Sequence, residues 1–316
     1  MSPSEAYRAQ VALLVAALPF VAREEVFALK GGTAINLFVR NMPRLSVDID
    51  LTYLPIEPRE HSLAAIDAGM RRIGRSIETG LAGARVTPTR TGDHQPVTRL
   101  LVRRGRAQVK IEVTPVLRGC VYAHEWRRVS PMVEEAFGFA EIQLVSFADL
   151  YAGKAIAALD RQHPRDLFDI RDLLANEGID DVLRSAFLIY LISHDRPISE
   201  IVAPRRKDLT GEFTTGFVGM SDPSVSLDEL LAAREKLIEH MIGAMPQEHR
   251  RFLVDFKRGS PDWEAINLSA AASLPAVKWK QTNLDRLAHD ARKKQISRLE
   301  QILFPPSPTP KNPLNP

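Results

Sequence analysis

The first half of the chain alternates between helical and strand patterns. Val47, Ile49 and Leu51 occupy every second position of one segment, which is the period of a strand with one buried face. A glycine pair interrupts the apolar run before it and predicts a turn between a strand and a helix. In order, we predict a helix over residues 4–18, a strand over 26–30, a helix over 33–39, a strand over 46–53, a helix over 60–78, and strands over 85–89, 98–103 and 108–113.

The second half of the chain has a mainly helical pattern. Ser146 followed by Asp149 fits a capping box that opens a helix over 147–159, and Pro164 suits the first position of the next helix, over 165–174. Helices then dominate, apart from an irregular stretch over 194–223 that is rich in Pro, Gly, Ser and Thr. The sequence thus predicts an α+β protein with a mixed domain over 1–140, a helical domain over 141–304 and a proline-rich, frayed tail over 305–316.

Composition narrows the class of protein. The 316 residues are 45% hydrophobic and 26% charged, which suits a globular protein and excludes a fibrous or disordered chain. The single cysteine, Cys120, excludes a disulfide framework or a cysteine-rich zinc site and favours the cytoplasm. The apolar stretch over 11–21 contains Pro19 and is too short to cross a bilayer, so no membrane association is expected.

Basic charge is concentrated at the C-terminal end. The net charge is +3, but residues 275–316 contain eight basic and three acidic side chains. A basic helix over 283–303 could bind the phosphates of a nucleic acid. Its basic residues could equally form a solvated helix face. The histidines are scattered without the spacing of metal ligands, and neither a P-loop nor a Gly-x-Ser-x-Gly motif occurs.

The candidate chemistry begins at a glycine turn. Gly31 and Gly32 precede Thr33 at the start of a predicted helix. Backbone N–H groups at a helix start, together with a threonine hydroxyl, can hold a phosphate. The same glycines could also be present for steric reasons alone.

Three carboxylates fit a divalent metal site. Asp48 and Asp50 lie two residues apart and therefore on the same face of one strand, where they repel each other unless a cation lies between them. Mg²⁺ prefers carboxylate and phosphate oxygens, and two such ions can promote phosphoryl or nucleotidyl transfer. Glu112, on the polar face of a later strand, would be the third carboxylate. Alternatively, it faces solvent beside a lysine.

These motifs resemble a known superfamily. The order Gly31-Gly32-Thr33, Arg44-x-Ser46-x-Asp48-x-Asp50 and then Glu112 is similar to that of the DNA-polymerase-β-type nucleotidyltransferases. Two later segments, 149–155 around Lys154 and 165–170 with Arg165, Asp166 and Asp169, resemble the lysine and arginine-aspartate motifs of the AbiEii-type toxins of type IV toxin–antitoxin systems. The four motifs lie between residues 29 and 174, and we assign no residues beyond them.

The resemblance implies a role for each motif of the first half. Asp48 and Asp50 would bind Mg²⁺ or Mn²⁺, and Glu112 would complete the metal site or accept the proton of the attacking hydroxyl. The amides of Gly31 and Gly32, with Thr33, would hold the triphosphate of an NTP. Arg44 would contact nucleotide phosphate. Ser46 lies at the mouth of the site, where a covalent modification would add negative charge and block catalysis.

The helical motifs would contribute two further catalytic residues. Lys154 would reach the phosphates and stabilise the transition state, unless it only extends to solvent at the domain edge. Asp169 would be catalytic, oriented by Lys154 and by Arg165 four residues before it. Arg165 and Asp166 would belong to the nucleotide-binding residues, unless Asp166 only caps the helix or forms an ion pair. The alternative for both aspartates is an ordinary ion pair on a surface helix.

The resemblance also implies an activity. The protein would be a metal-dependent nucleotidyltransferase that moves NMP from an NTP to RNA in a cleft between the two domains. The acceptor would be the 3′ end of tRNA, so that aminoacylation and translation stop, and a separately encoded antitoxin would counteract it. Two alternatives stay open: transfer to a protein or small molecule, as in AMPylation or antibiotic modification, and a catalytically silent interaction protein.

Overall fold

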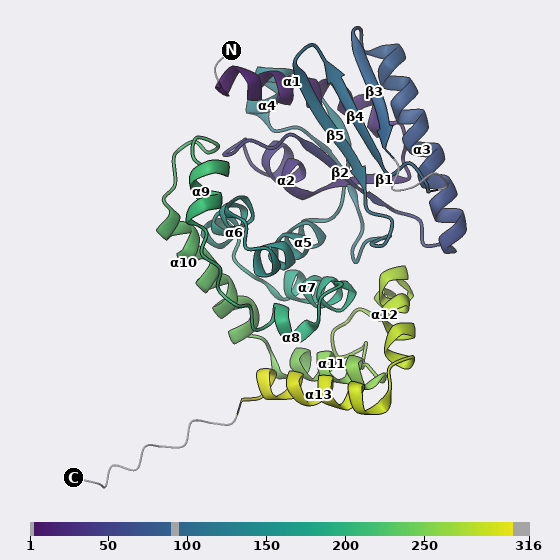
Figure 1. Cartoon of the computed structure of the whole chain (residues 1–316), viewed down its shortest axis with the longest axis vertical. Coiled ribbons are helices and arrows are strands. Elements are labelled where there is room, and N and C mark those ends of the chain that lie inside the picture. Colours follow the sequence, from purple (N-terminus) through teal and green to yellow (C-terminus); the bar gives the residue numbers. More distant parts are fainter. Residues whose placement is uncertain (1–2, 90–94, 306–316) are drawn as a thin grey trace, which may run out of the picture.

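A seven-stranded mixed sheet forms the first half of the molecule, with a layer of helices below it in Figure 1. The structure, a computed structural model, describes residues 3–89 and 95–305. The strand order is β3-β4-β5-β2-β1-β7-β6. The strands are β1 (Phe27–Lys30), β2 (Asp48–Tyr53), β3 (Ala84–Thr89), β4 (Arg99–Arg104), β5 (Ala107–Val113), β6 (Glu125–Arg128) and β7 (Glu141–Leu144).

The helices alternate with strands at first and then follow one another. They are α1 (Pro3–Ala22), α2 (Gly31–Ala34) with a π-helical turn (Ile35–Val39), α3 (Arg59–Gly80), α4 (Pro131–Phe137), α5 (Phe147–Asp160), α6 (Pro164–Asn176), α7 (Asp181–Ser193), α8 (Ile198–Ile201), α9 (Thr210–Gly216), α10 (Leu227–Leu237), α11 (Gln247–Arg258), α12 (Pro275–Asp285) and α13 (His289–Leu303), with a second π-helical turn (Ile238–Gly243) and a 3₁₀ turn (Ser269–Ser273). The α+β class predicted from the sequence is confirmed.

The centre of the sheet positions the candidate site. β2 runs antiparallel to β1 and parallel to β5, so three strands that carry candidate residues are neighbours. Their apolar side chains, such as Leu29, Ile49 and Ile111, are fully buried. Helices α1 and α3 pack against the sheet, which closes the core on that face.

Helix α1 is strongly apolar. Among the described residues it is the one helix with the length and composition of a membrane span, with a mean hydropathy of 1.3 over Glu5–Ala22. Its Val11, Leu14 and Leu18 are buried, and the helix packs against β5 and β7. Its apolar side chains are therefore part of the core of this fold.

The helical half is built around α5. This helix contacts α6, α7 and α8, and it also touches α2 of the first half. Ten of its side chains are buried, which explains why its sequence is apolar on nearly every side. Because α5 lies between the sheet and the other helices, it brings Lys154 close to the glycine turn.

Several boundaries differ from those predicted. The sheet includes β7 (Glu141–Leu144) and therefore extends a few residues past position 140. β6 and α4 were not predicted, because Glu125–Arg128 is mostly exposed and has no apolar alternation. The stretch over 194–223 contains α8 and α9, and the helix predicted over 283–303 is broken between Asp285 and His289. The proline-rich tail lies outside the described residues, except for Pro305.

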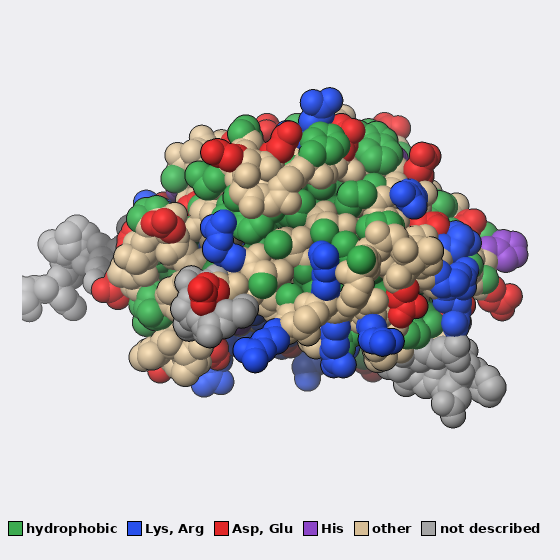
Figure 2. Space-filling model, turned by 90° about the horizontal axis from the view of Figure 1, so that it is seen from above, with side chains coloured by type: hydrophobic (Ala, Val, Ile, Leu, Met, Phe, Trp, Pro, Cys, Tyr) green, Lys and Arg blue, Asp and Glu red, His purple; other side chains and the backbone are tan. Residues whose placement is uncertain are grey.

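The end of the molecule at the top of Figure 1 shows no single charged surface. Acidic and basic side chains are both spread over this face, with hydrophobic side chains exposed between them (Figure 2). The candidate residues lie elsewhere, where the sheet meets α5 and α6.

Candidate active site

The glycine turn packs directly against candidate site residues. Gly31 has a φ of +76° at the junction of β1 and α2, a conformation that favours glycine. A β-carbon on Gly31 would lie 2.7 Å from Oδ2 of Asp50, and one on Gly32 would lie 2.8 Å from Nη2 of Arg44 and 3.0 Å from Oγ of Ser46. Neither position has room for a side chain. The close packing alone therefore requires glycine at both positions, whether or not the turn also binds a phosphate.

The strand register brings the carboxylates to one face of the sheet. Asp50 on β2 is opposite Glu112 on β5, and Asp48 is opposite Lys110. Lys110 Nζ is 3.0 Å from Oε2 of Glu112 and 3.9 Å from Oδ1 of Asp48. A cation therefore lies between these two carboxylates in the structure, in the form of a lysine.

Glu112 is held by two bases. Its Oε1 accepts a hydrogen bond of 2.8 Å from Arg99, in addition to the contact with Lys110. Burial opposes its charge, but these hydrogen bonds keep the pKa of Glu112 below its ordinary value. The lysine neighbour considered from the sequence is thus present, on the same face as Asp50.

Asp50 has the opposite electrostatic environment. Burial raises its pKa, and Asp48 and Glu112 raise it further, while Lys30 and Lys110 act against them. Burial in turn lowers the pKa of Lys30, whose charge Asp50, Cys120 and Glu112 favour. Lys30 pairs with Asp50 in the β1–β2 register, so the two side chains form a mutually dependent pair.

The donor set fits a hard divalent cation, although no metal-like cluster is preformed. Among the described residues, no three His, Cys, Asp or Glu side chains are gathered closely enough to hold a metal ion. Asp48 and Asp50 could supply oxygen ligands from one strand face. Burial raises the pKa of Asp50 most, and the charge of Asp48 raises it further, so a cation beside these two aspartates would favour their ionised forms.

A buried ion network joins the two halves of the chain. Arg44 donates to both carboxylate oxygens of Asp169, from Nε at 2.7 Å and from Nη2 at 2.6 Å. Asn36, in the π-helical turn, donates to Gly32 O at 2.9 Å and to Asp169 Oδ1 at 3.2 Å. Asp169 is therefore tied to the loop before β2 and to the glycine turn, and not to a local helix partner.

Lys154 lies between two aspartates of α6. Its Nζ is 2.9 Å from Oδ1 of Asp166 and 3.0 Å from Oδ2 of Asp169, and its side chain is 7% exposed. Burial opposes the charge of Lys154, but the two carboxylates raise its pKa. Burial alone would raise the pKa of both aspartates. Nevertheless, Arg44 and Lys154 lower the pKa of Asp169, and Lys154 and Arg161 lower the pKa of Asp166. The three groups are thus charged together.

This network corrects two expectations about α6. Asp166 and Asp169 are each 1% exposed, so they do not belong to a solvated helix face. The basic partners of Asp169 are Lys154 and Arg44, and not Arg165. The backbone N–H of Arg165 donates to His163, the N-cap residue of α6. Lys154 is buried as well, so it does not extend to solvent.

Thr33 and Ser46 form the floor of the glycine turn. The fully buried Thr33 hydroxyl donates to the carbonyl of Asp48 and lies 3.0 Å from Oγ of Ser46. Thr33 thereby fixes the start of β2. Ser46 is only half-buried and lies next to Gly32, so an added group there would meet the turn directly.

A cleft between the two halves opens beside these groups. Its volume is about 410 Å³, and Gly31, Asp50, Lys154 and Arg161 are in its walls. Arg161 donates to both oxygens of Asp166, at 2.5 and 2.9 Å, and its side chain is mostly exposed. Residues of the sheet and of the helical half therefore face one open cleft that also contains basic groups, which suits an anionic ligand such as a triphosphate.

The family model of the nucleotidyl transferase AbiEii toxin, type IV TA system, matches residues 12–283 of this chain. The chain belongs to this family. It is therefore a nucleotidyltransferase toxin, and membership implies an NTP substrate and a separate antitoxin. A search of curated proteins finds no match.

The fold of this AbiEii toxin also has a solved counterpart. MenT4, the nucleotidyltransferase toxin Rv2826c from Mycobacterium tuberculosis H37Rv, superposes with a TM-score of 0.59 at 17% sequence identity. The similarity covers 88% of this chain and 93% of that one. At this identity the likeness concerns the fold alone.

The structure of this AbiEii toxin adds residues that the motifs did not single out. Lys30 and Arg161 face the cleft, and Lys110 and Arg99 bind Glu112. Lys30 could have been found, because a lysine directly before the glycine pair ends β1 next to Asp50 on β2. Lys110 was considered from the sequence only as a solvent-facing neighbour of Glu112, and Arg99 and Arg161 carry no pattern that distinguishes them from surface bases.

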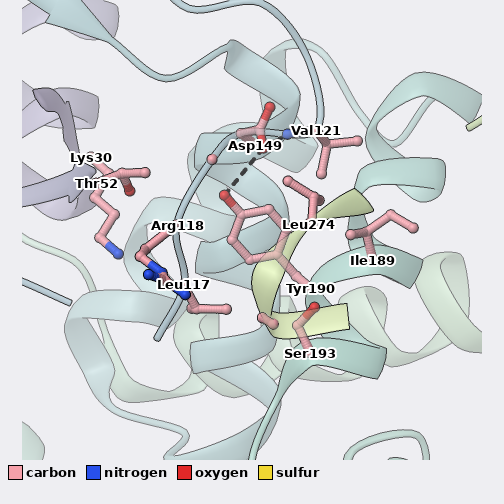
Figure 3. A pocket seen from close by; sticks show the side chains of 12 residues that line it. Lys30, Thr52, Leu117, Arg118, Val121, Asp149, Ile189, Tyr190, Ser193 and Leu274 are labelled. Atoms are coloured by element: carbon pink, nitrogen blue, oxygen red, sulfur yellow. Dashed lines mark hydrogen bonds between the residues drawn. The ribbon is translucent and has the colours of Figure 1, made fainter. Parts of the chain in front are cut away.

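Asp149 has a structural task within the lysine motif. Its carboxylate accepts hydrogen bonds from the backbone of Val121 and Tyr122, at 2.8 and 3.0 Å, and from the Tyr190 hydroxyl at 3.2 Å. Figure 3 shows the Tyr190 bond in a small pocket that Lys30 and Arg118 also line. Asp149 thus fastens the loop after β5 to α5 and α7. Ser146 caps α5 as predicted, accepting from the N–H of Asp149.

Proposed function

We propose that this toxin transfers NMP from an NTP to a hydroxyl of RNA and releases pyrophosphate, with the 3′ end of tRNA as the acceptor in the cytoplasm. The observation that supports this most is the position of Asp50. It contacts the glycine turn, lies opposite Glu112 in the strand register, and faces a cleft that Lys154 and Arg161 also line. Nucleotidyl transfer needs carboxylates and phosphate-binding groups at one place.

In this proposal the carboxylates hold Mg²⁺ or Mn²⁺. Asp48 and Asp50 would be the main ligands. Glu112 would be a third ligand once the metal replaces Lys110 as its ionic partner. Bound there, the ion supplies charge neutralisation at the reacting phosphate. Because its pKa lies below the ordinary value, Glu112 suits a ligand better than a proton acceptor at neutral pH.

The chain's own bases would bind the phosphates. Arg161 is exposed at the cleft, and Lys30 lies at its wall beside Gly31, so both are placed to meet an anionic ligand. Lys154 and Arg44 are already paired with buried carboxylates, so each would contact a phosphate only in addition to those partners. In the proposal their first task is to hold Asp169 and the glycine turn in place, which keeps the cleft preorganised.

The test is a labelling experiment with purified protein. The protein is incubated with Mg²⁺, total RNA and each of the four labelled NTPs in turn, beside the Asp48→Ala/Asp50→Ala variant. We expect label in a tRNA-sized band with the intact protein only, which would also identify the preferred base. Label in the protein fraction or in a small molecule, with none in RNA, would overturn the RNA acceptor in favour of another one. No label in any fraction, with the fold intact, would overturn transfer by this protein alone.

A further inference from the structure

A second concave surface lies next to the cleft. We name it the α12 groove: about 840 Å³ between the start of α12 and the loops after β2 and β5, with Ile56, Arg59, Val116, Arg118, Lys278 and Trp279 among its lining residues. In Figure 1, α12 lies beside the loops at the lower end of the sheet. No motif of the sequence pointed to this groove.

The groove gathers exposed apolar side chains. Ile56 is 51% exposed, Val116 46% and Trp279 55%, and they account for three of the nine large hydrophobic residues that are exposed in the described part of the chain. Large apolar side chains that converge in a hollow mark a binding surface more often than scattered ones do. An indole that is half open can stack on a planar ligand.

The groove also contains basic groups that form no ion pair among the described residues; its one acidic lining residue, Glu57, accepts a hydrogen bond from Tyr53. Arg118 is 7% exposed, yet its Nε and Nη1 have no hydrogen-bond partner among the described residues. Burial lowers its pKa, and nearby Arg59 lowers it further, whereas Glu57 and Tyr53 act against this. Lys278 is exposed on α12 and makes no ion pair with any described residue. A buried guanidinium with free donors is unfavourable unless an acceptor binds there.

One short segment connects the groove to the cleft. Val116 faces the groove, Leu117 lines the cleft, and Arg118 lines the groove and the small pocket of Figure 3. Consecutive residues of this segment therefore belong to the walls of both cavities, so the groove and the cleft are neighbours. Helix α12 begins at Pro275, which lines the groove, and it has no capping side chain, so the positive end of the helix lies at the groove.

Building on the proposed function, we infer that the α12 groove binds an unpaired RNA segment next to the hydroxyl that enters the cleft. A base stacks on Trp279 between Ile56 and Val116, and backbone phosphates contact Arg118, Arg59 and Lys278. Proteins bind single strands with this combination of an aromatic platform and a basic groove. The groove therefore selects unpaired RNA over a duplex, whose bases are not free to stack.

The test measures RNA binding without NTP. A fluorescent ten-nucleotide single-stranded RNA and its duplex are titrated with full-length protein, and anisotropy gives the Kd. We expect Trp279→Ala to weaken single-strand binding about tenfold, and Trp279→Phe to retain most of it. The matched control is Trp126→Ala, because Trp126 is 50% exposed on β6 and lies outside the groove; its Kd should equal that of the wild type.

The phosphate contacts have their own readout. For Arg59→Ala/Lys278→Ala we expect the slope of log K against log salt to become less negative by about 1.4, because two phosphate contacts are lost. The matched control, Arg104→Ala/Arg106→Ala at the turn between β4 and β5, lies outside the groove and should leave the slope unchanged. Both pairs are exposed, so folding is not expected to suffer.

The outcomes separate this inference from the proposed function. Wild-type protein that fails to bind single-stranded RNA, binds duplex equally well, or binds unaltered after Trp279→Ala overturns the groove as an RNA site. Binding that depends on Trp279, in a protein that labels no RNA, supports the groove while the proposed transfer to RNA fails. Binding of labelled NTP, measured in parallel, should be the same in Trp279→Ala and wild type; a parallel loss would overturn a separate acceptor site.

Discussion

Gly31 and Asp50 are in such close contact that a β-carbon on the glycine would lie 2.7 Å from the aspartate Oδ2. The contact joins the turn after β1 to the carboxylate of β2. Any side chain at position 31 must therefore displace a candidate metal ligand.

We expect Gly31→Ala to abolish nucleotidyl transfer and to reduce stability by more than backbone strain alone. The matched control is Gly83→Ala, because Gly83 has nearly the same φ, +77°, with no atom within 4 Å of the added β-carbon. The control should lose about 1–2 kcal/mol of unfolding free energy and retain full activity. Thermal unfolding and the labelling assay measure both effects; equal behaviour of the two variants would contradict the contact.

Asp50→Asn should abolish transfer without lowering stability at pH 7. The pKa of Asp50 is raised, above all by burial, so its ionised form is less favourable in the folded state than in the unfolded state, and a neutral amide removes that penalty. Asp166→Asn is the control of opposite sign, because the pKa of Asp166 is lowered by Lys154 and Arg161 despite burial. Urea unfolding should show Asp50→Asn at or above the wild type and Asp166→Asn clearly below it.

Mg²⁺ should stabilise the wild type in the absence of NTP. A ligand that binds only the folded state at 100 times its Kd adds about 2.7 kcal/mol, so the melting temperature should rise with Mg²⁺ concentration. The Asp48→Ala/Asp50→Ala variant should show no such rise, and EDTA should reverse it in the wild type. A rise of equal size in the variant would place the metal elsewhere.

Asp169→Ala should be the most destabilising single change among the ion-paired residues considered. It leaves Arg44 and Lys154 buried with one carboxylate fewer, and breaking a buried pair in this way costs about 3–5 kcal/mol. The exposed pair of Glu300 with Arg258 is the comparison; Glu300→Ala should cost at most about 1 kcal/mol. Chemical denaturation decides between the two classes, and similar losses would mean that the network contributes little.

Acid should weaken the fold through the same network. The pKa of Asp166 and that of Asp169 are lowered by their basic partners despite burial. The stability they contribute is therefore complete above the unfolded carboxyl pKa of about 3.9 and is lost as the pH falls below it toward the folded values. The urea midpoint, measured between pH 7 and 3, should fall less steeply in Asp169→Asn than in the wild type. Parallel curves would refute this origin of the acid sensitivity.

The strand patterns predicted much of the site. Alternation in β2 predicts that Asp48 and Asp50 share a face, and the polar position of Glu112 in β5 predicts the third carboxylate on the sheet. The structure pairs β2 with β5 in the register that puts Asp50 opposite Glu112. Local periodicity was sufficient here because each residue's face depends only on its own strand.

The partners of Asp169 could not be predicted in the same way. Helix spacing pointed to Arg165, which is four residues away, whereas the structure pairs Asp169 with Arg44, 125 residues away. Such a contact depends on how α6 docks against the loop before β2, and no short-range repeat in the sequence indicates it. The α12 groove could not be predicted for the same reason, since its walls come from three separate parts of the chain.

The pairing of Arg44 with Asp169 also bears on when the protein can become toxic. During synthesis the chain emerges from the ribosome N-terminus first, so the glycine turn and both aspartates of β2 leave before α6 exists. Until then Arg44 and Lys154 lack the carboxylate of Asp169. Under the proposed function, a nascent chain therefore does not yet present the completed candidate site to the translation machinery that is making it.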